Sequence, residues 1–226
     1  INNFQKKISR YTLRFVFLPE TIGSITYLHH NLNTLKKNTI AGFNLTCIGD
    51  EKNFQFMETK YGNSVSDKAL KEAYKVLKIN PKMISFLENG SDERQYNSPG
   101  IDLPVASIFK TKYGNYVEYH TSDDNFDFVT FKGLKDGYKI AKKAIDIINT
   151  KIIPMTNYMC EPQMGKRNLY PHISTGTKLD SQKRIMNFLQ FCDGRNDLED
   201  IAKKIKININ LTKKIHKKLL EHRLIR

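Results

Sequence analysis

The sequence predicts an α/β protein with a doubly wound, mostly parallel sheet, followed by a small winged helix-turn-helix domain at the C-terminal end. Two observations lead to this fold class. Between Tyr11 and Ile153, short apolar runs alternate with amphipathic helical patterns, the order of a parallel sheet covered by helices. From Lys178 onward three short helical patterns follow one another, with a turn between the second and the third, as in a helix-turn-helix.

The first domain is predicted over residues 1–156. Its strands are short runs rich in β-branched and aromatic residues: Tyr11–Leu18, Ile40–Ile48, Asn53–Glu58, Met83–Leu87 and Leu103–Phe109. Its helices have apolar residues three or four positions apart: Gly23–Leu35, Val65–Lys78 and Phe131–Ile153. Two polar stretches predict long loops of the kind that often hold functional groups: Glu88–Gly100 and Tyr113–Asn125.

A Pro- and Gly-containing linker is predicted over residues 157–177, and a winged-helix domain over 178–226. The helices of that domain are expected at Gln182–Cys192, Asn196–Ile205 and Leu211–Glu221, with Asn196 or Asp197 as a cap and a wing strand within His222–Arg226. The third helix turns four lysines outward, and they could lie along phosphates: Lys213, Lys214, Lys217 and Lys218. Because no set of residues for reading base edges accompanies them, packing, dimerisation or protein contacts are favoured over DNA binding.

The composition is typical of a globular protein with a large positive charge. The chain has 226 residues, 39% of them hydrophobic, and a formal net charge of +14. Clustered Lys and Arg attract polyanions, but Lys, Asn and Ile are abundant together, which favours a solvated basic surface without such a partner. No apolar run approaches the roughly 20 residues that cross a bilayer, so a soluble cytoplasmic protein is expected. Three scattered cysteines without a CxxC pair suggest neither a disulfide framework nor a thiolate zinc site.

Two polar segments could carry chemistry. The first is EYHTSDDNFDFV, Glu118–Val129, where a histidine lies among acids and offers the imidazole and carboxylate donors that zinc accepts. The alternative is a loop histidine that is only hydrogen-bonded. The second is Asp92-Glu93-Arg94, whose acids could ligate a metal, orient His120 or bind an amine, while Arg94 could bind a carboxylate. An internal salt-bridge cluster is the alternative there.

Four segments in order resemble the zinc-dependent aminopeptidase-like family whose bacterial members end in a winged helix: FLPETIGSITYL, NLTCIGD, SDERQYNSPGIDLPVASI and EYHTSDDNFDFV. The segment CEPQMGKRNLY, Cys160–Tyr170, looks like the piece that joins the two domains in that family. The resemblance covers nearly the whole chain. It implies a zinc aminopeptidase-like α/β fold for the first domain, of which this chain is the C-terminal portion.

The resemblance also implies roles for individual residues. Glu20, just before Gly23-Ser24, matches the glutamate that acts as general base or metal ligand, and Asp50 and His120 match metal ligands. The remaining matches are substrate-binding or supporting residues of the site: Asp92, Glu93, Arg94, Tyr119, Asp123 and Asp124. The family takes a further His and a bridging Asp from upstream of Tyr11, and nothing before that residue supplies them. A fragment is therefore expected rather than a degenerate homologue.

The function implied is a metal-dependent hydrolase with one or two zinc ions in the complete protein. It would cleave an amide or peptide bond in a small peptide-like or N-acyl substrate that bears an amine, in bacterial surface-polysaccharide or modified-sugar biosynthesis. The alternative is a catalytically inactive scaffold or regulator whose basic winged helix binds nucleic acid or a protein partner. The sequence leaves a homo-oligomer open.

Overall fold

The computed structural model describes residues 9–167, 169 and 176–226. The chain forms two compact units, and the division falls between Thr150 and Lys151. Positions 168 and 170–175 of the expected linker lie outside the described residues, whereas Met164 and Leu169 are buried in the core of the second unit. Part of the stretch expected as a linker therefore belongs to that core.

The first unit is built on a four-stranded mixed sheet. In spatial order its strands are β1 (Gly42–Leu45), β4 (Val105–Phe109), β2 (Gln55–Met57) and β3 (Lys82–Ile84). β1 pairs with β4 and β2 with β3 in parallel, but β2 runs antiparallel to β4. The carboxyl ends of β1 and β4 therefore lie at the same edge of the sheet, and β4, buried at all five positions, forms its centre.

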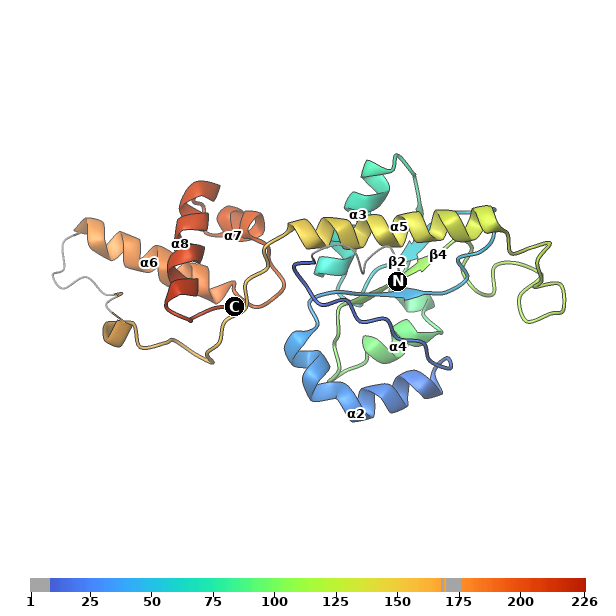
Figure 1. Ribbon diagram of the computed structural model, residues 1–226, viewed down its shortest axis with the longest axis horizontal. Helices are drawn as coiled ribbons and strands as arrows, with labels where there is room; N and C mark the ends of the chain where they lie inside the picture. The colour runs from blue at the N-terminus through green and yellow to red at the C-terminus, as the bar shows by residue number, and fades with distance from the viewer. Residues whose placement is uncertain (1–8, 168, 170–175) are drawn as a thin grey trace. The chain divides into compact units, whose positions relative to one another are not determined.

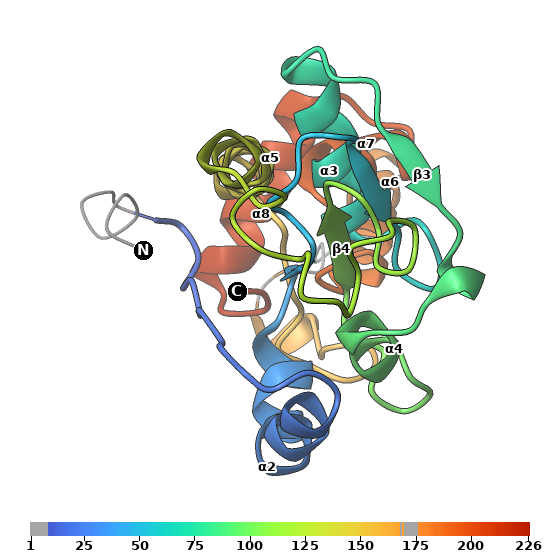
Figure 2. The same cartoon turned by 90° about the vertical axis from the view of Figure 1, so that its right-hand side faces the viewer.

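Helices cover both faces of this sheet. α3 (Val65–Val76) and α5 (Phe131–Thr150) lie on one face, and α2 (Ile22–Asn38) and α4 (Asp92–Tyr96) on the other (Figures 1 and 2). α3 begins at a capping box in which Ser64 and Asp67 exchange side-chain and backbone hydrogen bonds, an arrangement that satisfies the free amides of a helix start. The helices predicted from apolar spacing are thus all present.

Glycine allows α5 to approach the loop after β1 closely. A Cβ atom on Gly133 would lie 1.9 Å from the carbonyl oxygen of Gly49, and one on Gly137 would lie 2.9 Å from the Cβ of Ile48. The two glycines are four residues apart and so share one face of the helix. Any side chain at Gly133 would push α5 away from the backbone of residues 49 and 50.

Two sequence predictions are wrong. Tyr11–Leu18, expected as a buried strand, belongs to no strand of the described sheet, and Phe15, Val16 and Phe17 are exposed. A strand needs a neighbouring strand for its backbone hydrogen bonds, and none of the four strands of the described sheet pairs with this segment. The stretch Glu88–Gly100 is not an irregular loop throughout, because it contains α4, where Ser91 is the N-cap residue and Asp92 and Glu93 occupy the first turn.

The second unit contains α6 (Gly176–Gln190), α7 (Leu198–Lys204) and α8 (Ile209–Glu221). Asp197 is the N-cap of α7 in a capping box with Asp200, as one of the two predicted caps. The C-terminal stub pairs back on the start of the unit, with antiparallel hydrogen bonds between Met155 and Arg226 of 2.8 and 2.9 Å. No helix in the described part of the chain is both long and apolar enough to cross a membrane.

Candidate active site

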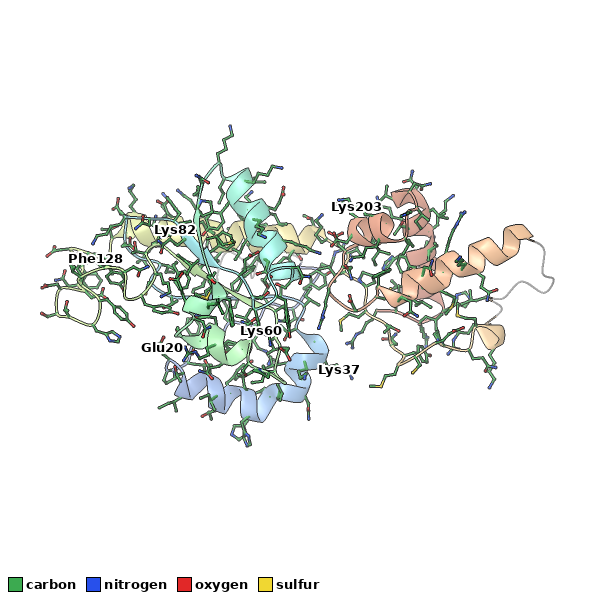
Figure 3. The ribbon with its side chains drawn as sticks, turned by 180° about the vertical axis from the view of Figure 1, so that it is seen from behind. Glu20, Lys37, Lys60, Lys82, Phe128 and Lys203 are labelled. Carbon is green, nitrogen blue, oxygen red and sulfur yellow. The ribbon has the colours of Figure 1, made fainter. Side chains whose placement is uncertain are left out.

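The candidate site is centred on Glu20, in the turn that precedes α2. The Glu20 carboxylate is exposed and accepts a hydrogen bond from the hydroxyl of Ser91, at the start of α4. The same turn is fixed a second time, because the amide of Thr21 donates to Oδ1 of Asp92 at 2.8 Å. Figure 3 shows Glu20 at the end of the unit where Phe128 and its loop also lie. Two independent contacts therefore tie the Glu20 turn to the first residues of α4.

Glu93 is the buried anchor of this arrangement. Its carboxylate is fully buried and accepts hydrogen bonds from Tyr113 Oη at 2.7 Å and from the amides of Gly90 and Ser91 at 2.9 and 3.0 Å. Two strand residues, Asn44 and Ser107, add donors at 3.3 Å. Burial raises the pKa of Glu93, but the hydrogen bonds from Tyr113, Ser91 and Gly90 outweigh it and lower the pKa below its usual value. Glu93 thus holds Ser91 in position as an ionised group whose charge is satisfied by protein hydrogen bonds.

Arg94 points away from the acids beside it. Its Nε donates to Oδ1 of Asn89 at 2.6 Å, and one terminal nitrogen donates to the Asn89 carbonyl oxygen at 2.8 Å. Asp92 and Glu93 receive their hydrogen bonds from other groups, namely Thr21 for Asp92 and the five donors of Glu93. In the described residues this segment is therefore a hydrogen-bonded helix start rather than a salt-bridge cluster.

Asp50 is a buried structural acceptor in this structure. It is 2% exposed, and its two oxygens accept hydrogen bonds from the Thr111 amide at 2.8 Å, the Thr111 hydroxyl at 2.7 Å and the Lys52 amide at 2.8 Å. On the other side of the following loop, the amide of Thr130 donates to the Gly49 carbonyl oxygen at 2.9 Å. Residues 49 and 50 therefore hold both ends of the segment between β4 and α5.

The segment between those ends contains the predicted histidine and several stacked rings. His120 is exposed, adopts a left-handed backbone with φ of 58° and stacks on Tyr119 with ring centroids 3.9 Å apart. Burial raises the pKa of the Tyr119 hydroxyl, and the negative charge of Glu20 raises it further. Cys47 has the same effect on Tyr119, which is therefore near enough to both groups for their charges to act on it.

A second stacked pair supports the same loop. Tyr116 stacks on Phe128 with ring centroids 4.9 Å apart, and its hydroxyl donates to Sγ of Cys47 at 3.4 Å, just after β1. Burial raises the pKa of Tyr116, and Cys47 and Asp124 raise it further. The carboxylates of Asp123 and Asp124 are exposed, and the amide of Asp123 donates to the Thr121 hydroxyl at 3.2 Å. The acids expected to support the site are thus on the solvent side of the loop.

The described residues do not form a complete zinc site by themselves. Nowhere in residues 9–167, 169 and 176–226 do three His, Cys, Asp or Glu side chains come together in a way that could hold a metal ion. The three predicted ligands make other contacts. Glu20 accepts a hydrogen bond from Ser91, Asp50 accepts hydrogen bonds from Thr111 and Lys52, and the ring of His120 stacks on Tyr119. A zinc site would need further ligands, since a catalytic zinc takes about three protein donors at close range and these three do not come together.

Sequence reasoning missed the residues that organise the site. Three hydroxyl groups hold the acids of the site: that of Ser91 bonds to Glu20, that of Tyr113 to Glu93 and that of Thr111 to Asp50. None of the three donors belongs to a recognisable motif of its own. One local signal was present, because a serine followed by two acids is typical of a helix start. The lysines of α8 are all exposed, as predicted, but nothing in the structure tests whether they contact nucleic acid: Lys213, Lys214, Lys217 and Lys218.

The two units match two families. Residues 2–151 match the family described as "Domain of unknown function (DUF4910)", and residues 151–226 match a winged helix-turn-helix family. The chain is 40% identical, over 198 residues, to a Clostridium acetobutylicum protein that is assigned by inference to polysaccharide biosynthesis and has an aminopeptidase-like domain. That alignment covers 87% of this chain and 45% of the relative.

Comparison with solved structures also shows similarity to a longer Clostridium acetobutylicum protein. A Clostridium acetobutylicum protein assigned by inference as a peptidase matches 99% of this chain and 50% of its own length, with 35% identity and a TM-score of 0.64. At 16% identity and a TM-score of 0.48, the similarity to the zinc aminopeptidase of Bacillus subtilis is too low to indicate activity. The chain spans about half the length of the relatives that it matches over most of its residues. It therefore belongs to the DUF4910 family, and it combines an aminopeptidase-like α/β unit with a C-terminal winged helix-turn-helix domain.

Proposed function

We propose that the α/β unit is part of an aminopeptidase-like hydrolase that cleaves an amide or peptide bond in a small substrate bearing an amine. Bacterial surface-polysaccharide or modified-sugar biosynthesis is the proposed setting, supported by the name of the 40% identical relative. The observation that carries the proposal is the Glu20 carboxylate, exposed in the turn before α2 and oriented by the Ser91 hydroxyl.

The chemistry of Glu20 follows from its contacts. Among the described residues, Ser91 alone hydrogen-bonds this carboxylate, so one oxygen is oriented and the other can accept a proton from a water or bind a substrate ammonium. Ser91 itself is held through its amide by Glu93, which is fixed to the sheet. The Tyr119–His120 pair offers a flat aromatic surface and an imidazole that can donate or accept a proton.

Zinc remains part of the proposal for the complete natural protein. A bound zinc ion would supply a water of lowered pKa and polarise the carbonyl of the scissile bond. Within the described residues, His120 is the most accessible donor because it is exposed and its ring contacts only Tyr119. Asp50 would have to exchange its hydrogen bonds to Thr111 for metal coordination, and we propose that it keeps its structural role.

The test is hydrolysis of aminoacyl anilides and of N-acyl amino sugars by the complete natural protein. We expect Glu20→Gln to lower kcat by roughly a hundredfold or more, the usual effect of losing a general base, with little change in thermal stability. The matched control is Glu72→Gln, which removes an exposed acid from α3 and should leave kcat unchanged. Equal rates for Glu20→Gln and the natural protein would exclude this role of Glu20.

Metal content is measured on the same variants. Zinc bound in a defined ratio and lost in His120→Ala, but kept in Asp50→Asn, would agree with the proposed division of roles. Zinc lost in Asp50→Asn while the fold remains intact would contradict it. The alternative function, a non-catalytic scaffold, is favoured if the complete protein hydrolyses neither class of substrate.

A further inference from the structure

The winged-helix unit contains a pocket that the proposed hydrolase does not use. The pocket has a volume of about 430 Å³ and lies between α6 and the turn that joins α7 to α8. This volume is near the lower end of the range of roughly 300–1,000 Å³ for ligand pockets. The lysines Lys213, Lys214, Lys217 and Lys218 of α8 are not among its lining residues, so the pocket is distinct from the surface predicted to face phosphates.

The rim of the pocket is cationic. Lys183 and Arg184 reach it from α6, and Lys206 reaches it from the α7–α8 turn, where the backbone is left-handed with φ of 55°. Among the described residues that line the pocket, none is acidic. Three cations converging on one concave surface raise the local concentration of anions, and Arg and Lys both bind carboxylates through charge-assisted hydrogen bonds.

The floor of the pocket is aliphatic. Ile205, Ile207 and Leu211 line it, and each is only partly buried where it packs on the core of the unit. Binding is favoured when an apolar group of a ligand displaces water from apolar side chains that are half-covered in a concave site. The pocket therefore suits a ligand that presents an apolar group to the floor and negative charges to the rim.

We propose that this pocket binds an acidic peptide segment of a partner protein through one large apolar side chain flanked by carboxylates. A nucleic-acid backbone would bring phosphates to Lys183, Arg184 and Lys206 but no apolar group for the floor. The combination of aliphatic floor and cationic rim thus favours the peptide.

The test uses the full chain and a fluorescently labelled five-residue peptide with phenylalanine at its centre and two acidic residues on each side. We expect fluorescence anisotropy to show binding that weakens about tenfold when serine replaces the phenylalanine. A double variant, Lys183→Glu with Lys206→Glu, should weaken binding by at least as much. The matched control is Lys217→Glu, which reverses an exposed charge on α8 outside the pocket and should change the affinity less than twofold.

Three results would overturn the proposal. The first is the absence of binding at peptide concentrations of about 1 mM, and the second is equal binding of the serine peptide, which would indicate attraction by charge alone. The third is displacement of the peptide by duplex DNA together with an equal loss in Lys217→Glu, which would assign the surface to nucleic acid. If the double variant does not fold, amide chemical shifts of the unmodified chain decide: peptide-induced changes at Lys206, Ile207 and Leu211 support the pocket, and changes elsewhere refute it.

Discussion

The hydroxyl of Tyr113 donates a 2.7 Å hydrogen bond to the carboxylate of Glu93 and thereby joins the loop after β4 to the start of α4. The same carboxylate bonds to Ser107 on β4 and to the amide of Ser91, whose hydroxyl contacts Glu20. A single buried acid therefore connects the sheet, the loop and the candidate general base. Its removal should affect both the stability of the unit and the geometry of the site.

Glu93→Gln is expected to destabilise the first unit by about 3 kcal/mol. If the new amide oxygen keeps the bonds from Gly90, Ser91 and Tyr113, the NH₂ group takes the place of Oε2, where it cannot accept the hydrogen bond from the Asn44 amide group. Chemical denaturation followed by circular dichroism measures the free energy of unfolding. Glu72→Gln, an exposed change on α3, is the control and should be nearly neutral. A loss of less than about 0.5 kcal/mol in Glu93→Gln would show that the buried hydrogen bonds contribute little.

The stability of the unit should fall in acid because of the same residue. The pKa of Glu93 is lowered in the folded state, so its ionised form stabilises the fold above the unfolded pKa of about 4.3. This contribution is lost as the pH falls through the lower, folded pKa. The difference in unfolding free energy between the natural chain and Glu93→Gln should therefore shrink between pH 6 and pH 3, and a constant difference would contradict the assignment.

Gly133→Ala should be among the most damaging single changes in the α/β unit. The added Cβ would meet the carbonyl oxygens of Gly49 and Asp50 at 1.9 and 2.5 Å, and neither backbone group can move without disturbing the Asp50–Thr111 hydrogen bonds. We expect a loss of about 3 kcal/mol. Lys135→Ala, two residues along α5 and exposed, controls for the change in helix sequence, and an equal effect of the two would argue against the close packing.

The cysteines should differ in reactivity. Cys160 is exposed, whereas Cys192 is 1% exposed and burial raises the pKa of its thiol to about 12. Because the thiolate is the reactive form, a maleimide at pH 7.5 should label Cys160 in the folded chain roughly a hundredfold faster than Cys192. Peptide mapping by mass spectrometry measures both rates, and the double variant Cys47→Ser with Cys160→Ser leaves Cys192 as the one cysteine of the chain. Fast labelling of Cys192 without denaturant would show that the hydrophobic core of the second unit unfolds locally and often.

Sequence patterns predicted the helices and the helix cap, because these depend on interactions between residues that are close in the sequence. The spacing of apolar residues predicted α2, α3 and α5. The Asp197 cap could be predicted because a capping box involves only residues close in the sequence. The fold class followed from the order of these elements. By contrast, the antiparallel direction of β2 against β4 depends on where the chain returns, which an apolar run does not encode.

The sequence predictions that were wrong or incomplete also concern contacts between residues that are far apart in the sequence. Tyr11–Leu18 has the composition of a buried strand, but strand formation depends on a partner far away in the sequence. The role of Asp50 is decided by Thr111, 61 residues away, and no motif links the two positions. Glu20, Tyr119 and His120 could be proposed by resemblance, while Ser91, whose hydroxyl orients Glu20, became visible only in three dimensions.

The pairing of Thr111 with Asp50 and of Thr130 with Gly49 means that the intervening segment leaves the scaffold and returns to it at nearly the same point. The part of the segment beyond Tyr113 and Tyr116, whose hydroxyls contact Glu93 and Cys47, can therefore change in length while both attachment points and the strands behind them stay the same. Exchanging residues 117–127 for a loop of another length should leave the sheet folded.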